Sequence, residues 1–250
     1  HSGWEQGGVW LAPLYFEGDK VPGARALRVA TPTYDALIRT APRTEIISLA
    51  VSPSGSAPRN VLDSAPRGTG PYIGAAAFGA TDRAGAAAKV EWGNDGRALT
   101  LREIPIGSQP VKVDWSFDFA DETFDTSLVW NVASPISVKE ASFAIDATLS
   151  VFESDGKPRT GDVSGFSPFT MVSDANVTLV TAYKKGSAFR TTNHYVDSFG
   201  HFVAWQYAFG GAGKAMVPAG ALPGGHFRFG ASNKGADLAL GLILYDGLSK

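Results

Sequence analysis

The sequence predicts an all-β protein, an antiparallel β-sandwich with long loops, and three observations support this prediction. Few windows repeat apolar residues with the helical period of about 3.6 residues. Many short stretches instead alternate apolar and polar residues, as strands with one buried face do. The 250 residues include 29 Gly and 15 Pro. Together with Asn and Asp, these turn-forming residues separate the alternating stretches.

The first part of the chain has the weakest strand pattern. Arg43 to Val51 is the best strand there, and Leu27 to Val29 is a weaker one. Ser52 to Ala88 and Gly210 to Gly225 are rich in Gly and Ala, so both are expected to be long loops. We expect one domain over residues 1–250, because β-sandwiches often reach this length. A separate unit of residues 1–88 is the alternative, although its strand pattern is thin for an independent core.

The strongest element is a hairpin around Asp121-Glu122. Val111 to Phe119 alternates without a break, and Phe124 to Val132 continues the pattern after the turn. Closing the turn on Asp121-Glu122 pairs residues whose numbers sum to 243, and a one-residue slip would spoil every apolar pair. The pairs expected on the apolar face are Phe119 with Phe124, Phe117 with Thr126, Trp115 with Leu128, Val113 with Trp130 and Val111 with Val132.

The remaining strands follow from the same alternation. Lys89 to Trp92 and Arg97 to Ile104 flank Gly93-Asn94-Asp95-Gly96, which is a strong turn sequence. Further strands are expected at Val138 to Ile145, Thr148 to Glu153, Val177 to Tyr183, Ala188 to Thr192, Phe202 to Phe209, His226 to Phe229 and Leu238 to Tyr245.

Charge and composition exclude several classes of function. The 24 acidic and 22 basic residues give a net charge of −2, so no overall field draws the chain to nucleic acid or to an anionic membrane. The absence of cysteine excludes disulfides, thiol nucleophiles and zinc–thiolate sites. No apolar run reaches the roughly 20 residues of a membrane helix. The first residues lack a basic and apolar signal, so such a segment has been removed or never existed, and we expect a secreted or periplasmic protein.

One group of candidate site residues lies at the turn end of the strong hairpin. Asp118 and Asp125 are expected opposite each other on the polar face, with Asp121 and Glu122 in the turn. Like charges across a ladder cost stability, so they invite a cation, a Lys or Arg partner, or a catalytic use. The candidates are a solvated acidic edge, a calcium site held by Asp121 and Glu122, or an acid with a nucleophile or base. Glu45 is an alternative partner for Asp118 in the last case.

A second group lies in residues 190–201, which we expect to connect two strands. His194, Tyr195 and His201 provide groups for proton transfer, because imidazole titrates near neutral pH and a nearby cation can lower the pKa of a phenol. The substrate-binding candidates around them are Arg190, Asn193 and Asp197, together with Arg43. A polar loop that covers the sheet is the alternative, and a metal site at the two histidines lacks a third ligand placed by spacing.

Aromatic residues near this segment favour a carbohydrate ligand. Trp205 and Tyr207 follow the second group closely. Aromatic rings beside carboxylates and amides suit sugar rings, whose C–H faces are apolar while their hydroxyls form hydrogen bonds. Packing in the core is the alternative for either side chain.

Two families resemble this chain in part. Arg43-Thr44-Glu45-Ile46 resembles part of the arginine-and-glutamate strand motif of alginate-lyase-type jelly rolls, and Tyr183-Lys184-Lys185-Gly186 is similar to their tyrosine-bearing strand. The glutamine-and-histidine motif of that family is not found between them. The long β-rich chain with scattered His and acidic residues also resembles the mutarotase-type supersandwich of sugar epimerases and many glycosidases. Both resemblances imply a carbohydrate substrate.

We therefore expect a carbohydrate-active protein that cleaves glycosidic bonds of a polysaccharide or oligosaccharide. Hydrolysis would use Asp118 with Asp125 or Glu45, whereas β-elimination would use His194 or Tyr195, with Arg190 or Arg43 neutralising a uronate. No nucleotide-binding glycine loop and no Gly-x-Ser-x-Gly motif occurs. The alternatives are a non-catalytic carbohydrate-binding module with structural calcium and a structural or assembly protein.

Overall fold

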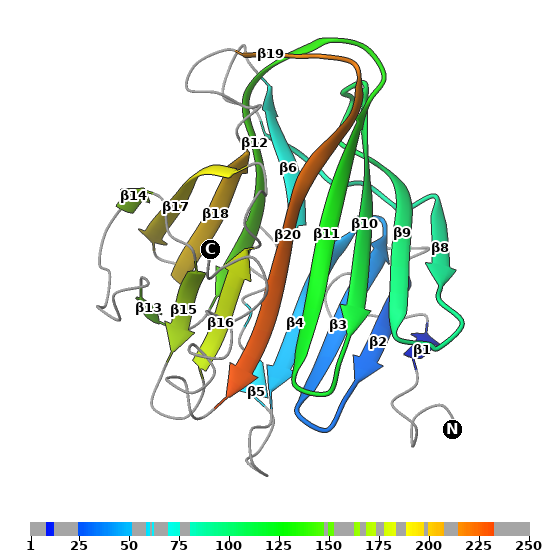
Figure 1. Cartoon of the computed structure of the whole chain (residues 1–250), viewed down its shortest axis with the longest axis vertical. Helices are drawn as coiled ribbons and strands as arrows, with labels where there is room; N and C mark the ends of the chain where they lie inside the picture. The colour runs from blue at the N-terminus through cyan, green and yellow to red at the C-terminus, as the bar shows by residue number, and fades with distance from the viewer. Residues whose placement is uncertain are drawn as a thin grey trace.

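The computed structural model confirms the predicted all-β class (Figure 1). It describes residues 9–12, 25–51, 59–60, 62, 70–75, 81–147, 150–152, 163–165, 169–173, 178–183, 189–197, 200–207 and 215–232. Within these ranges there is no helix, and all the strand pairs are antiparallel. No helix in the described part of the chain is therefore long and apolar enough to span a membrane.

The strands form three sheets. The five-stranded sheet consists, in spatial order, of β1 (Val9–Ala12), β2 (Arg25–Ala30), β3 (Tyr34–Ala41), β4 (Glu45–Val51) and β5 (Arg59–Asn60). The eight-stranded sheet consists of β13 (Ser150–Phe152), β15 (Phe169–Ser173), β16 (Thr178–Tyr183), β20 (Gly220–Ser232), β11 (Thr123–Val132), β10 (Val111–Phe119), β9 (Ala98–Pro105) and β8 (Lys89–Trp92). The third sheet has the order β14 (Val163–Gly165), β17 (Phe189–Asp197), β18 (Gly200–Tyr207), β12 (Ile136–Ala147), β6 (Gly70–Ala75) and β7 (Thr81–Arg83), and β19 (Ala215–Val217) also pairs with β12.

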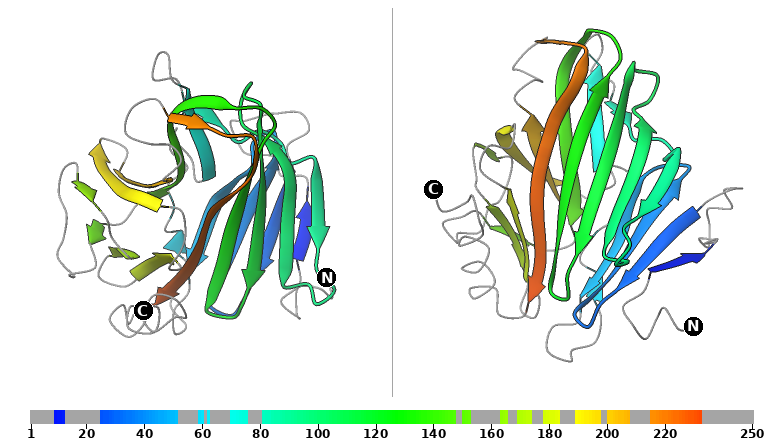
Figure 2. Two further views of the ribbon diagram at one scale, coloured as in Figure 1. Left: turned by 45° about the horizontal axis from the view of Figure 1, so that its top comes forward. Right: turned by 45° about the vertical axis from the view of Figure 1, so that its right-hand side comes forward.

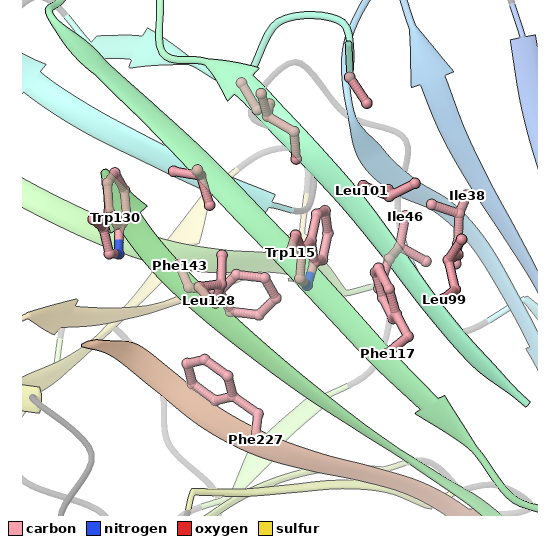
Figure 3. Packing of buried hydrophobic residues seen from close by; sticks show 14 of the residues in the cluster. Ile38, Ile46, Leu99, Leu101, Trp115, Phe117, Leu128, Trp130, Phe143 and Phe227 are labelled. Atoms are coloured by element: carbon pink, nitrogen blue, oxygen red, sulfur yellow. The ribbon is translucent and has the colours of Figure 1, made fainter. Parts of the chain in front are cut away.

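The eight-stranded sheet forms one layer, and the other sheets pack on its apolar face. Figure 2 shows β20, β11, β10 and β9 side by side, with the blue strands β2 to β4 as a second layer. Between the layers, Ile38 and Ile46 lie near Leu99 and Phe117 (Figure 3). Burying each such side chain contributes about 1.5–3 kcal/mol.

Aromatic rings join the eight-stranded sheet to the sheet that contains β12. The ring of Phe143 on β12 lies 5.6 Å from Trp115 and 4.7 Å from Phe227, measured between centroids. Gly70 on β6 lies where all three sheets meet, because a Cβ there would be 3.2 Å from the carbonyl oxygen of Thr44 and 3.6 Å from the Trp115 ring. One buried cluster thus includes residues from Leu27 to Phe229. The single domain over residues 1–250 stays a prediction, and a separate unit of residues 1–88 stays its alternative.

The register of the strong hairpin is confirmed. Every pair whose numbers sum to 243, from Val111 with Val132 to Phe119 with Phe124, occurs in the β10–β11 ladder. The hairpin at residues 89–104 is confirmed as β8 and β9. The alternation that predicted both is visible in the burial, because odd-numbered residues of β10 are buried and even-numbered ones are more exposed.

Other predictions about strands were wrong or incomplete. Ser52 to Ala88 is not one long loop, because it contains β5, β6 and β7, and Gly210 to Gly225 contains β19 and the start of β20. The strand β3 was missed, and β2 is longer than predicted. β6 was missed because Gly70–Ala75 is buried through Gly74 and rich in Gly, so no polar face produces alternation. The predicted strand Leu238 to Tyr245 lies outside the described residues.

Residues 190–201 are not a connecting loop. β17 continues to Asp197 and β18 begins at Gly200, so most of this segment forms a hairpin in the third sheet. Thr191 and Thr192 suit a strand because they are β-branched. Pairing with β14 on one side and with β18 on the other keeps the segment in the sheet although many of its residues are polar.

Candidate functional site

The polar face of the eight-stranded sheet carries the best-defined candidate site. We call this surface, which faces away from the core, the outer face. Asp118 on β10, Asp125 on β11 and Arg228 on β20 form one row across it, because Asp125 pairs with Asp118 on one side and with Arg228 on the other. The buried neighbours Phe117, Phe119 and Phe227 point to the core, so the alternation directs the charged residues outward.

Asp118 and Asp125 thus lie opposite each other as predicted, and Arg228 is the cation that offsets the repulsion between the two carboxyl groups. Arg228 donates hydrogen bonds from Nε to Asp125 Oδ1 at 2.6 Å and from Nη2 to Asp125 Oδ2 at 2.8 Å. His226 Nε2 lies 3.7 Å from Asp125 Oδ2. Asp118 is exposed, and no hydrogen bond or ion pair of its side chain is found within the described part of the chain.

The surroundings of Asp125 keep its carboxyl group ionised. Burial of the side chain raises its pKa, but the hydrogen bonds and positive charges of Arg228 and His226 outweigh this effect. The pKa of Asp125 is therefore held well below its ordinary value. The two carboxyl groups therefore differ in environment, because Asp125 is held as an anion whereas Asp118 is exposed and has no cation partner among the described residues.

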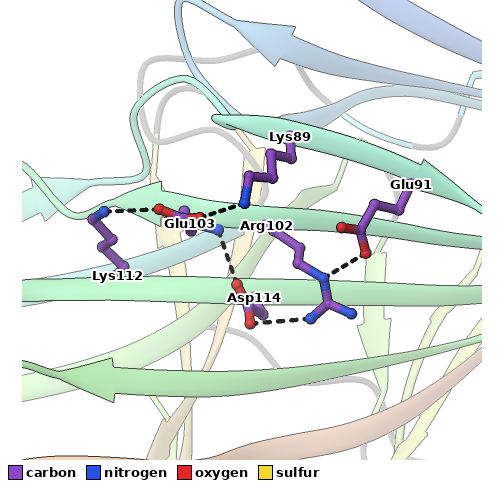
Figure 4. Close-up of polar contacts among 6 residues, drawn as sticks. All are labelled: Lys89, Glu91, Arg102, Glu103, Lys112 and Asp114. Carbon is purple, nitrogen blue, oxygen red and sulfur yellow. Dashed lines mark hydrogen bonds and ion pairs between the residues drawn. The ribbon is translucent and has the colours of Figure 1, made fainter.

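The other carboxylates of the outer face belong to a separate network on β8, β9 and β10 (Figure 4). Asp114 accepts a hydrogen bond of 3.3 Å from Arg102 and one of 2.9 Å from the backbone N–H of Glu103. The ladder between β9 and β10 is irregular there, and Glu103 has a φ of 55°. Arg102 also donates to Glu91 at 2.5 Å, and Glu103 is paired with Lys89 and Lys112. This β8–β10 network balances its own charges.

The acidic turn is held by the five-stranded sheet. The hydroxyls of Thr31 and Thr33 both donate to the carbonyl oxygen of Asp121, the former at 2.9 Å, and Tyr34 Oη donates to Ala120 O at 2.8 Å. Burial and the charge of Asp121 raise the pKa of Tyr34, so its hydroxyl stays protonated as the donor. The described residues contain no group of three or more side chains that could hold a metal ion. A calcium site at Asp121 and Glu122 stays a prediction.

Glu45 and Arg43 lie away from this site. Glu45 pairs with Arg39 on the face of the five-stranded sheet that points away from the core, and its side chain forms an ion pair with that arginine. Arg43 is exposed in the turn between β3 and β4. Glu45 is 13% exposed and paired with Arg39 in the five-stranded sheet, whereas Asp118 lies on the outer face of the eight-stranded sheet, so the structure does not pair them.

The second predicted group lies on β17 and β18, where the structure gives the backbone positions. His194 pairs with Val203 and His201 with Val196, so the alternation places both histidines on one face of the third sheet. Trp205 shares that face, because it pairs with Thr192 and with Phe143. Tyr195, Asn193 and Asp197 fall on the opposite face. Arg190 lies at an irregularity of the ladder, and Tyr207 pairs with Phe189.

The two predicted groups do not form one site. Asp118 and Asp125 lie on the outer face, whereas the third sheet packs against the opposite, apolar face through Phe143. The alginate-lyase-like segments belong to different sheets, because β4 is in the five-stranded sheet and β16, which ends at Tyr183, is in the eight-stranded sheet. Arg228 and His226 were not predicted as site residues, since their partner Asp125 is about a hundred positions away in the sequence.

No protein-family model matches this chain, and no curated protein matches it in sequence. Several solved structures do match its fold. A protein from Escherichia coli K12, provisionally assigned as an aldose 1-epimerase, aligns over 84% of this chain and 99% of its own, with a TM-score of 0.55 and 8% identity. The Slr1438 protein from Synechocystis sp. PCC 6803 aligns over 89% of this chain and 100% of its own, with a TM-score of 0.55 and 9% identity.

A longer enzyme contains the same fold as one part. The 4-alpha-glucanotransferase from Thermococcus litoralis aligns over 84% of this chain with a TM-score of 0.58 and 9% identity, and this chain spans only 38% of that enzyme. The fold is therefore a galactose mutarotase-like β-sandwich, a fold found in carbohydrate-related proteins. The fold implied by the mutarotase-type resemblance is confirmed. At these identities the likeness shows the fold alone.

Proposed function

We propose that this protein hydrolyses glycosidic bonds of a polysaccharide or oligosaccharide in a secreted or periplasmic setting, with Asp118 and Asp125 as its carboxyl pair. The observation that carries the proposal is the row across β10, β11 and β20. It sets an exposed carboxyl group opposite one that Arg228 and His226 keep ionised. Directly paired residues of an antiparallel ladder have Cβ atoms about 4.5–5.5 Å apart. Retaining glycosidases need carboxyl groups about 5–5.5 Å apart.

The two carboxyl groups have different roles in this reaction. Asp118 donates a proton to the glycosidic oxygen as the bond to the leaving sugar breaks, and Asp125 attacks the anomeric carbon. Asp118, now a base, takes a proton from water, whose oxygen attacks the anomeric carbon and releases Asp125. Arg228 donates to both Asp125 oxygens, so it holds the carboxylate in one orientation. The fold supports the substrate class, since its neighbours include a glucanotransferase and a protein assigned as an aldose epimerase.

Product analysis in ¹⁸O-labelled water tests the proposal. The protein is incubated with a panel of neutral and uronate polysaccharides, with and without calcium, and soluble fragments are analysed by mass spectrometry. Hydrolysis gives fragments that carry one ¹⁸O, with retained anomeric configuration in proton NMR. Asp118→Asn and Asp125→Asn should each reduce the rate at least about a hundredfold. The control Glu91→Gln, in the β8–β10 network, should retain the parent rate. Fragments that lack the added water would instead indicate β-elimination and direct attention to His194 and Tyr195.

A non-catalytic carbohydrate-binding module is the second candidate. The observation that favours it is the bidentate contact of Arg228 with both oxygens of Asp125, which also satisfies this carboxylate as a structural ion pair. In this case the protein binds the polysaccharide and releases no fragments from any member of the panel. Binding without turnover would select this candidate over the hydrolase.

A further inference from the structure

A line of residues on β11 extends from Asp125 along the outer face. Ser127, Val129 and Asn131 follow Asp125 at every second position, and we call these three residues the β11 strip. Ser127 pairs with Ser116 on β10 and with His226 on β20, and Val129 pairs with Pro223. With a rise of about 3.4 Å per residue, the line from Asp125 to Asn131 is about 20 Å long.

The chemistry of the β11 strip alternates in a way that suits a sugar chain. Within the described residues, the side chains of Ser127 and Asn131 have no hydrogen-bond partner, so their donors and acceptors are available. Val129 between them is one of the few large apolar side chains that are exposed, at 39%. Hydroxyls of a sugar ring need hydrogen-bond partners, whereas its C–H faces need an apolar contact. The strip offers both in sequence on a rigid strand.

The charges of the outer face exclude an anionic chain. Each described cation around the strip is already paired with a carboxylate of the protein: Arg228 with Asp125, Arg102 with Glu91 and Asp114, and Lys89 and Lys112 with Glu103. A uronate polymer would therefore meet carboxylates without a cation to neutralise its own, whereas a neutral glycan meets no such cost.

We propose that the β11 strip binds an extended neutral glycan and leads it to Asp118 and Asp125. This inference rests on the proposed function, which places the chemistry at that pair, and it specifies the substrate as neutral. It also predicts that several sugar units contact the protein, because the line is about 20 Å long.

Calorimetric titration of the Asp118→Asn protein tests the inference, because this variant binds without turnover. The probes are cellohexaose, laminarihexaose, mannohexaose, maltohexaose and hexagalacturonate. At least one neutral hexasaccharide should bind, and hexagalacturonate should not. Adding Ser127→Ala and Asn131→Ala should weaken binding at least fivefold. The matched control is Ser48→Ala, which makes the same change on the outward side of the five-stranded sheet and should bind like the parent.

Three results would overturn the inference: tighter binding of hexagalacturonate than of every neutral probe, no binding of any neutral probe, or unchanged affinity in the Ser127 and Asn131 variant. A second measurement needs no strip variant. Affinity should rise from the disaccharide to the hexasaccharide of the bound series, and an affinity that does not change with length would contradict the inference. Turnover by the unaltered protein is assayed in parallel. Neutral binding at the strip without products would refute the hydrolase and retain only the glycan-binding strip, whereas products with unchanged strip affinity would support the hydrolase and refute the strip.

Discussion

The two ends of the outer face use the same kinds of charged residue in different ways. At one end, Asp125 and Arg228 are 19% and 27% exposed, and the pair joins strands that are far apart in the sequence. At the other end, the β8–β10 network joins neighbouring strands, with Arg102 at 43% exposure and Lys89 at 62%. The strength of an ion pair on this face, and how firmly it holds its side chains, therefore depend on burial more than on the number of ion pairs.

This difference indicates where chemistry can occur on the face. Water screens the exposed network, so its pairs stabilise the fold little. The partly buried pair interacts more strongly, and it holds the Asp125 carboxylate in one geometry beside Asp118. The proposed hydrolysis uses this fixed anion next to the exposed Asp118 carboxyl group, and it assigns no role to the screened network.

The largest expected effect is the loss of the partly buried pair. Arg228→Met removes the two guanidinium hydrogen bonds to Asp125 and leaves a partly buried carboxylate with weaker compensation, so the free energy of unfolding should fall by about 2–3 kcal/mol. Urea unfolding at pH 7 measures it. The double variant Arg228→Met with Asp125→Asn should recover part of the loss, because it removes the uncompensated charge. A single variant as stable as the parent would show that the pair is no stronger than the exposed network.

A smaller effect is expected in the pH dependence of stability. The folded pKa of Asp125 lies below its unfolded value of about 3.9, so its carboxylate stabilises the fold above that pH. This contribution is lost as the pH falls through the folded pKa. The stability difference between the parent and Asp125→Asn should therefore shrink by roughly 1–2 kcal/mol between pH 5 and pH 2. Parallel urea titrations measure it, and a constant difference would contradict the assignment.

The sequence predicted those parts of the site that depend on local pattern. The unbroken alternation of residues 111–119 and one turn were enough to place Asp118 opposite Asp125. Arg228 could not be predicted as their neighbour, because the pairing of β11 with β20 depends on the packing of Phe227 and Phe229 in the core. No pattern within a short window contains that information.

The fold shows the same limit. Strands with one polar face were predicted, whereas β6 was missed because it is buried and rich in Gly. His194 and Tyr195 were predicted to be in a loop because their segment is polar, although β14 and β18 pair with it on both sides. Pairing across the sequence, and not composition, decides whether such a segment becomes a strand.

The smallest effect is expected at the exposed end of the face. Arg102→Met removes the contacts with Glu91 and Asp114, but water solvates both carboxylates once the guanidinium is gone. The urea midpoint should therefore stay within error of the parent value, and hydrolysis should be unchanged. The backbone N–H of Glu103 keeps its hydrogen bond to Asp114, so the irregular ladder stays in register. Repeating the measurement in 1 M salt provides the control, since screening should remove any residual difference. A large loss at low salt would mean that the two ends are energetically alike, and burial would then no longer distinguish Asp125 as the site of the proposed chemistry.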